Sequence, residues 1–207
     1  MKNTRKFIFV FVLCLGLQIG SVADAKTNFT SAHGPAEAIS EADRALSTNP
    51  KDAKALYNRG TAHYEAGDFD AAIQDLSVSI AIEPTAPDAY YNRGLSYRKK
   101  KRVDEAIADY TKAIGLYSKQ PGYYINRSNA FLMKQDYESA IADCSKAVEL
   151  MPTDPVPYFL RGLARMFKGD NAGAIADADK ALELEPRYED AQRLKKEATA
   201  ASQDAPS

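Results

Sequence analysis

Apolar and small side chains recur along this chain with a period of 34 residues, without insertion or deletion. Four copies of the pattern follow one another. Each begins with a leucine or tyrosine, followed three residues later by an arginine and then by a glycine or serine. These positions are Leu56, Tyr90, Tyr124 and Tyr158, then Arg59, Arg93, Arg127 and Arg161, then Gly60, Gly94, Ser128 and Gly162. A fixed period of this length is typical of stacked supersecondary units rather than of a globular enzyme domain.

Each copy of the pattern predicts two helices. In copy one the first helix runs over about residues 53–65 and the second over about residues 70–82, with the Gly67-Asp68 turn between them. An aspartate before an apolar-periodic run favours a helix start, because its carboxylate accepts hydrogen bonds from unpaired backbone N–H groups. Prolines end the second helix in three copies, since proline cannot continue the hydrogen-bond ladder. They are Pro84, Pro152 and Pro186.

These residues resemble the tetratricopeptide repeat, whose pattern carries an aromatic, Leu-Gly, Tyr, Ala, Phe and Pro over 34 residues. The resemblance covers roughly residues 36–200. Departures are mild: Leu56 replaces the opening aromatic in copy one, arginine replaces the usual leucine in every copy, and His63 and Arg165 stand where tyrosine is expected. The resemblance implies an all-α fold. The helix pairs would be antiparallel and form an α-solenoid, a right-handed superhelix whose concave groove is lined mainly by first helices.

The two ends of the chain fit one solenoid domain. Residues 35–50 match only a second helix and predict a capping half-repeat, and residues 189–201 predict a charged capping helix, because terminal repeats need a polar outer face. The predicted segments are a signal peptide (1–25), a flexible linker (26–34), the half-repeat helix (35–50), four repeats (53–86, 87–120, 121–154 and 155–188), the capping helix (189–201) and a disordered tail (202–207).

The chain opens with the features of a secretory signal peptide. Positive charges at Lys2, Arg5 and Lys6 precede an apolar run over residues 7–20, and small residues favour cleavage after Ala25. A retained membrane anchor is the alternative, although the run is short for a span of about 20 residues. Cleavage changes the formal charge from −1 to −3, and such a chain lacks the basic footprint of nucleic-acid binding. We expect an exported protein, periplasmic or secreted and from a bacterial envelope, without a membrane span after cleavage.

The sequence contains no recognisable catalytic or metal-ligand pattern. Of the two histidines, His33 lies in the polar linker and His63 takes the place of an aromatic core residue. Cys144 lies at an inward position of a second helix, where a small buried side chain is the simplest interpretation. We therefore predict a non-enzyme that uses no cofactor and no metal.

A regular charge pairing links the two helices of the pattern. An aspartate follows each repeat arginine by sixteen residues, and the planar guanidinium fork suits a carboxylate. The predicted structural ion pairs are Arg59 with Asp75, Arg93 with Asp109, Arg127 with Asp143 and Arg161 with Asp177. Two arrangements remain open: bridges within one repeat, or bridges between neighbouring repeats. The second would bring Asp177 to Lys195 of the capping helix.

Asparagines form a ladder at Asn58, Asn92 and Asn126, two residues after each copy begins. An exposed amide can donate to and accept from a peptide backbone, so we expect the ladder to face the groove and hold an extended partner. The alternative is that asparagine is simply common at this position. A clamp for a C-terminal carboxylate, known in some relatives, requires a lysine and a second asparagine. Tyr57 and Thr61 stand there instead.

The predicted groove is polar and aromatic in copies one and two, and apolar in copies three and four. The capping helix covering part of the apolar half is the alternative to a partner site there. Over its whole length, the groove has these predicted partner-binding residues: Tyr57, Asn58, Thr61, Tyr91, Asn92, Arg98, Ile125, Asn126, Asn129, Met133, Phe159, Leu163 and Met166. The basic run over residues 98–102 is interpreted as a solvated turn.

The leading hypothesis is an exported adaptor or scaffold that binds an extended or helical protein segment in its concave groove. The alternative is a structural subunit that self-associates, as a homo-oligomer, or docks permanently into an envelope complex through its apolar C-terminal groove. Both hypotheses expect a protein or peptide partner and no nucleic acid.

Overall fold

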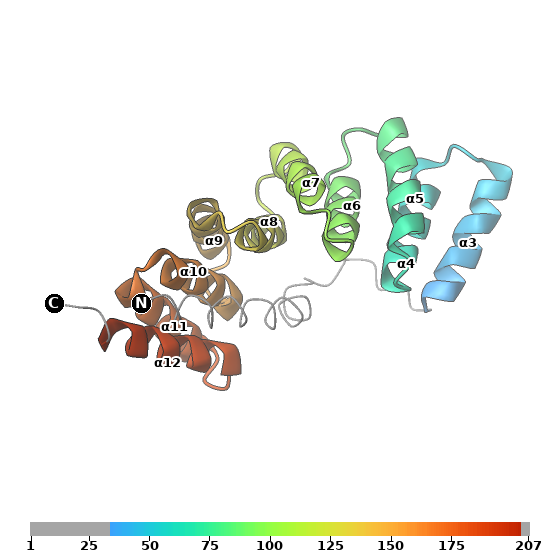
Figure 1. The fold of residues 1–207 in the computed structure, drawn as a ribbon. Coiled ribbons are helices and arrows are strands. Elements are labelled where there is room, and N and C mark those ends of the chain that lie inside the picture. Colours follow the sequence, from blue (N-terminus) through green and yellow to red (C-terminus); the bar gives the residue numbers. More distant parts are fainter. Residues whose placement is uncertain (1–33, 204–207) are drawn as a thin grey trace. The chain divides into compact units, whose positions relative to one another are not determined.

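A computed structural model describes residues 34–203, which form ten α-helices and no strand (Figure 1). The all-α solenoid predicted from the repeat is confirmed. The predicted signal peptide and most of the linker lie outside the described residues. The helices are α3 (Pro35–Thr48), α4 (Ala53–Glu65), α5 (Phe69–Ile82), α6 (Pro87–Lys99), α7 (Val103–Leu116), α8 (Pro121–Met133), α9 (Tyr137–Leu150), α10 (Pro155–Lys168), α11 (Asn171–Leu184) and α12 (Glu189–Gln203).

The last helix is longer than predicted. We expected residues 202–207 to be disordered, but α12 continues through Ser202 to Gln203. The Ser202 hydroxyl donates to the carbonyl of Ala198 (3.0 Å), which adds a side-chain bond to the last helical turn. The start of the predicted tail is therefore helical.

Aspartates cap five of the described helices, because their carboxylates accept hydrogen bonds from backbone N–H groups that have no partner within the helix. Asp52 accepts from the N–H of Ala55 at 3.0 Å, and the other capping carboxylates act alike: Asp68, Asp136, Asp154 and Asp170. The helices α3, α6 and α7 begin without a side-chain cap, at Gly34, Ala86 and Arg102.

The turn between the two helices of a repeat needs one residue with positive φ. Gly67 and Gly169 supply it in copies one and four, at 85° and 95°. Copies two and three place Lys101 and Gln135 in the same conformation, at 60° and 61°. A side chain with a Cβ is strained in this region, so these two turns are built from less suitable residues.

Small residues allow the first and second helices of a repeat to approach closely. A Cβ added to Gly60 would lie 2.8 Å from Cγ of Leu76, and one added to Gly94 would lie 2.7 Å from Cε1 of Tyr110. Real carbon atoms do not approach so closely in close-packed interiors. The glycine of the repeat therefore sets the spacing of α4 on α5 and of α6 on α7.

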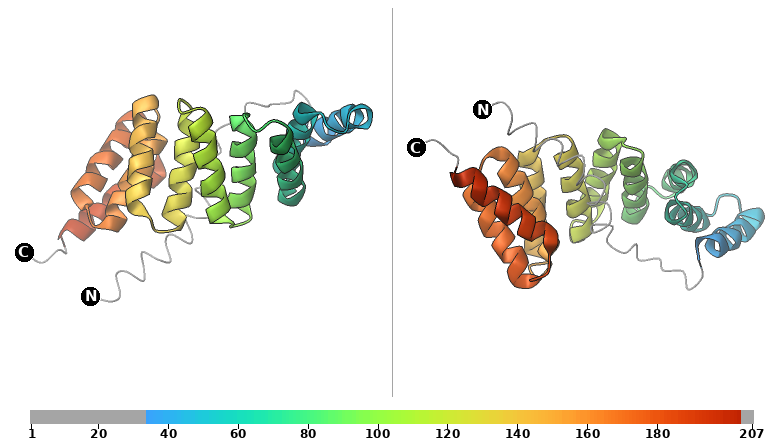
Figure 2. Two further views of the ribbon diagram at one scale, coloured as in Figure 1. Left: turned by 90° about the horizontal axis from the view of Figure 1, so that it is seen from above. Right: turned by 60° about the horizontal axis from the view of Figure 1, so that its bottom comes forward.

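Residues 34–203 divide into two compact units. In the N-terminal unit (residues 34–130), α4 packs on α3 and α5, and α6 packs on α5 and α7 (Figure 2). In the C-terminal unit (residues 131–203), α10 packs on α9 and α11, and α12 packs on α11 and α10. The superhelical handedness of the whole array stays a prediction.

Candidate binding surface

The repeat arginines hold the two helices of a repeat together. Arg59 on α4 donates from Nε and Nη2 to the two carboxylate oxygens of Asp75 on α5, at 2.7 and 2.8 Å. These hydrogen bonds raise the pKa of Arg59, so the guanidinium stays charged. Arg93 donates to both carboxylate oxygens of Asp109 in the same way (2.8 and 2.8 Å), and Arg161 donates to both oxygens of Asp177. Of the two predicted arrangements, these three arginine–aspartate pairs form the bridge within one repeat. Arg127 and Asp143 belong to different units, and their pairing stays a prediction.

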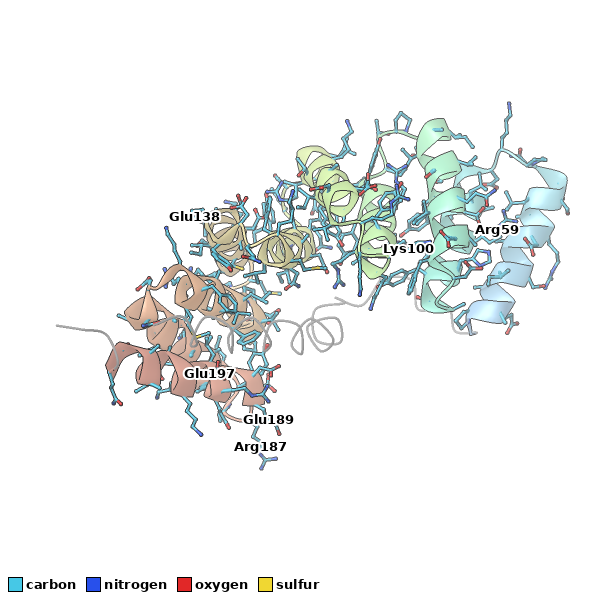
Figure 3. The ribbon with its side chains drawn as sticks, viewed as in Figure 1. Arg59, Lys100, Glu138, Arg187, Glu189 and Glu197 are labelled. Atoms are coloured by element: carbon cyan, nitrogen blue, oxygen red, sulfur yellow. The ribbon has the colours of Figure 1, made fainter. Side chains whose placement is uncertain are left out.

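Each of these arginines also reaches the preceding second helix. Arg59 donates from Nη1 to Asp43 on α3 at 2.7 Å, so it lies where α3, α4 and α5 meet (Figure 3). The equivalent bonds run from Arg93 to Ser77, from Arg127 to Thr111 and from Arg161 to Ser145. Lys195 of α12 contacts Asp179 at 2.7 Å. Asp179 occupies the same repeat position as the acceptors Asp43, Ser77, Thr111 and Ser145. Our sequence reasoning missed these acceptors, although their own 34-residue spacing was a usable signal.

Two residues of the basic run form ion pairs with acidic residues of the protein itself. Lys100, labelled in Figure 3, contacts Asp70 in the first turn of α5 at 2.5 Å, and Arg102 pairs with Glu105 at 2.8 Å. Lys168 and Glu138 occupy the repeat positions of Lys100 and Asp70 and lie 3.2 Å apart. Arg98, which we expected in the groove, is buried. Lys100 and Lys168 therefore each link one repeat to the one before it.

The asparagine ladder is buried, and the expectation that it is exposed is wrong. Asn92 is 3% exposed, and its Nδ2 donates to Oη of Tyr57 (3.2 Å) and Oγ1 of Thr61 (3.0 Å). Asn126 is 0% exposed, and its Nδ2 donates to Oη of Tyr91 (2.9 Å) and the carbonyl of Gly122 (3.0 Å). An amide nitrogen carries two hydrogens, so both are already used inside the protein.

The ladder therefore joins one first helix to the next. Each asparagine meets the tyrosine that lies 35 residues earlier, which pairs α4 with α6 and α6 with α8. That spacing was visible in the sequence. Nothing in the sequence pattern told us that these side chains face each other rather than a partner. Asn58 lies on the earliest first helix of the described residues and is half-buried.

A cluster of tyrosines with one carboxylate remains on the first helices of the N-terminal unit. Tyr57 is half-buried and Asp88, in the first turn of α6, is exposed. Tyr123 donates to Oδ1 of Asp88 at 2.5 Å, and its ring centre lies 4.9 Å from that of Tyr91. Burial and, next, the charge of Asp88 raise the pKa of Tyr57. Tyr91 and Tyr123 are buried, so Tyr57 and Asp88 are the members of this cluster that solvent reaches. We call Tyr57, Asp88, Tyr91 and Tyr123 the tyrosine–aspartate surface.

The apolar residues predicted for the C-terminal half of the groove are mostly buried. Phe159 packs against Tyr188, just before α12, with ring centres 5.3 Å apart. Gly162 of the same helix lies against Leu194 of α12, which a Cβ there would approach to 2.9 Å. Segments that lead into or form the capping helix therefore cover part of this half. Among the predicted groove residues, only Met133 is clearly exposed, at 46%. The buried ones include Ile125, Asn129, Leu163 and Met166.

Residues 34–203 contain no group of three or more His, Cys, Asp or Glu side chains placed to hold a metal ion. Within that same stretch, no helix has the length and apolar character needed to cross a membrane.

Comparisons with known proteins agree with this architecture. Tetratricopeptide repeat models match residues 41–74, 61–101, 87–120, 121–154 and 157–188. A comparison with curated proteins found no match. The solved structure of MamA is 24% identical with a TM-score of 0.69, over 72% of this chain and 87% of that one.

Two further solved structures are described as peptide complexes or peptide-binding proteins. YrrB, described as a TPR protein with an unusual peptide-binding site, is 18% identical with a TM-score of 0.71, over 78% of this chain and 84% of that one. The first TPR of Spaghetti (RPAP3), bound to an HSP90 peptide, is 29% identical with a TM-score of 0.56, over 57% of this chain and 94% of that one. On its repeats and its fold, the chain belongs to the tetratricopeptide repeat family.

Proposed function

We propose that this protein is a scaffold that binds an extended segment of a partner protein against the first helices of its N-terminal unit. The tyrosine–aspartate surface is the observation that carries the proposal. Tyr57 and Asp88 are accessible polar groups of the first helices, while the amide donors of Asn92 and Asn126 are used inside the protein. Similar solved proteins are described with a peptide-binding site and with a bound peptide, which supports the same role here.

The proposal includes export and the absence of catalysis. The basic residues, apolar run and small residues over 1–25 support an exported chain, periplasmic or secreted. Tetratricopeptide repeat proteins generally serve as scaffolds, which supports a non-enzyme. Fractionation of cells that express the full chain tests export: recovery in the cytosol at the uncleaved mass would overturn it.

Site-specific photocrosslinking tests the binding face. A photoreactive phenylalanine analogue is placed at Tyr57 in one variant and at Tyr117 in another, and both are irradiated in the native cells. Tyr117 is 49% exposed at the end of α7, a second helix, so it controls for non-specific capture. We expect a discrete heavier product from position 57 and none from position 117. Products from position 117 alone, or none from position 57, would refute the proposal.

A further inference from the structure

The tyrosine–aspartate surface carries one exposed negative charge, that of Asp88. Asp88 is exposed, and its Oδ1 is held by the hydroxyl of Tyr123. Within the described residues, its other oxygen, Oδ2, accepts no hydrogen bond and Asp88 forms no ion pair. An acidic residue in the first turn also interacts favourably with the helix dipole. The dipole does not account for the hydrogen bond by which Tyr123 orients the Asp88 carboxylate. Asp88 is therefore an oriented carboxylate with one side open.

A second negative charge, Glu65, acts on this surface. After burial, Asp88 and, more weakly, Glu65 raise the pKa of Tyr57, and Asp88 also raises that of Tyr123. Arg59, Arg93 and Arg127 on the first helices bond to residues of second helices. Of the other cations, Lys54 is exposed in the first turn of α4, whereas Arg98 and Lys99 lie in the last turn of α6. At least ten residues of α-helix, about 15 Å, separate these last two from Asp88.

The ring of Tyr57 suits a positive charge as well. It is half-buried, and Asn92 donates to its hydroxyl. Tyr91 and Tyr123 are buried, at 7% and 2% exposed, and lie in contact with each other. A tyrosine face attracts an ammonium or guanidinium group, and the attraction grows when the pair is partly removed from water. A carboxylate beside a half-buried tyrosine therefore favours a lysine or arginine side chain over an aspartate or glutamate.

We propose that the partner segment is basic, and that one of its lysine or arginine side chains pairs with Oδ2 of Asp88 beside Tyr57. This inference rests on the proposed function. The positions that would hold the carboxylate of an acidic tail carry the uncharged Tyr57 and Thr61, and Thr61 is itself bonded to Asn92. The surface is thus suited to basic rather than acidic partners.

Selection from a displayed library of random 12-residue peptides tests this inference. The immobilised full chain is compared with the variants Asp88→Asn and Glu41→Gln, at low salt. Glu41 is exposed on α3, away from the tyrosine–aspartate surface, so its variant removes the same charge elsewhere. We expect the ratio of basic to acidic residues in selected peptides to fall by up to about fivefold in Asp88→Asn, the scale of one partly exposed ion pair. It should stay unchanged in Glu41→Gln.

The other outcomes separate this inference from the proposed function. Selected peptides without a basic preference, or with one that survives Asp88→Asn, would overturn the charge assignment and leave peptide binding standing. Failure to select any peptide with the wild-type chain would overturn both. Equal loss in Asp88→Asn and Glu41→Gln would assign the preference to net charge, and would also overturn the role of Asp88.

Discussion

Replacing Asn92 by alanine should destabilise the protein, because the structure makes this residue a link between repeats. The substitution removes two hydrogen bonds, to Tyr57 and Thr61, in a site where Asn92 is 3% and Thr61 1% exposed. Each bond of this kind contributes about 1 kcal/mol net. Thr61 keeps its bond to the carbonyl of Tyr57 (2.9 Å), which limits the penalty for the partner left behind. We expect a loss of about 2 kcal/mol in unfolding free energy.

Asn58→Ala is the matched control for this prediction. Asn58 occupies the same repeat position, is half-buried, and makes no side-chain hydrogen bond to any residue within 34–203. Its replacement should change stability by less than about 0.5 kcal/mol, as for most substitutions away from buried networks.

Urea unfolding followed by circular dichroism at the helix band measures both variants, because the chain has no tryptophan to report by fluorescence. With a slope of about 2 kcal/mol per molar urea, Asn92→Ala should lower the midpoint by about 1 M. The slopes must agree between variants, since repeat arrays can lose two-state behaviour. Equal midpoints for the two variants would refute the reasoning, because the buried hydrogen bonds of Asn92 would then contribute nothing measurable to stability.

Two other substitutions test the helix contacts and the strained turns. Gly94→Ala places a Cβ 2.7 Å from the ring of Tyr110 and should lose about 1–3 kcal/mol by overpacking. Gly115→Ala, with open space around it, should gain up to about 1 kcal/mol. The order of their melting temperatures checks this, and a reversed order would contradict it. Lys101→Gly should gain about 0.5–1 kcal/mol, because glycine relieves the positive φ of 60°. A lower urea midpoint for this variant would show that the turn is not strained.

The sequence by itself determined the helix pairs, their starts and their closest contacts. An unbroken period forces every copy into the same conformation, so Asp68 and Asp170 at helix starts and Gly60 at a close approach could be assigned from local chemistry. The link from Arg59 to Asp75 was also accessible, because both residues belong to one repeat and its two helices pack on each other.

Only the tertiary structure decided which side chains remain available to a partner. A first helix such as α6 is covered by its own second helix α7, by the preceding second helix α5, and along one side by α4. The pattern along one helix shows which face is apolar, but it does not show how far a neighbouring repeat covers a polar face. Asn92 was therefore assigned to a ligand, although it bonds to Tyr57 of the preceding repeat. The sequence placed Asp88 in the groove but could not show how its carboxylate is oriented, because that depends on Tyr123, 35 residues away on another helix.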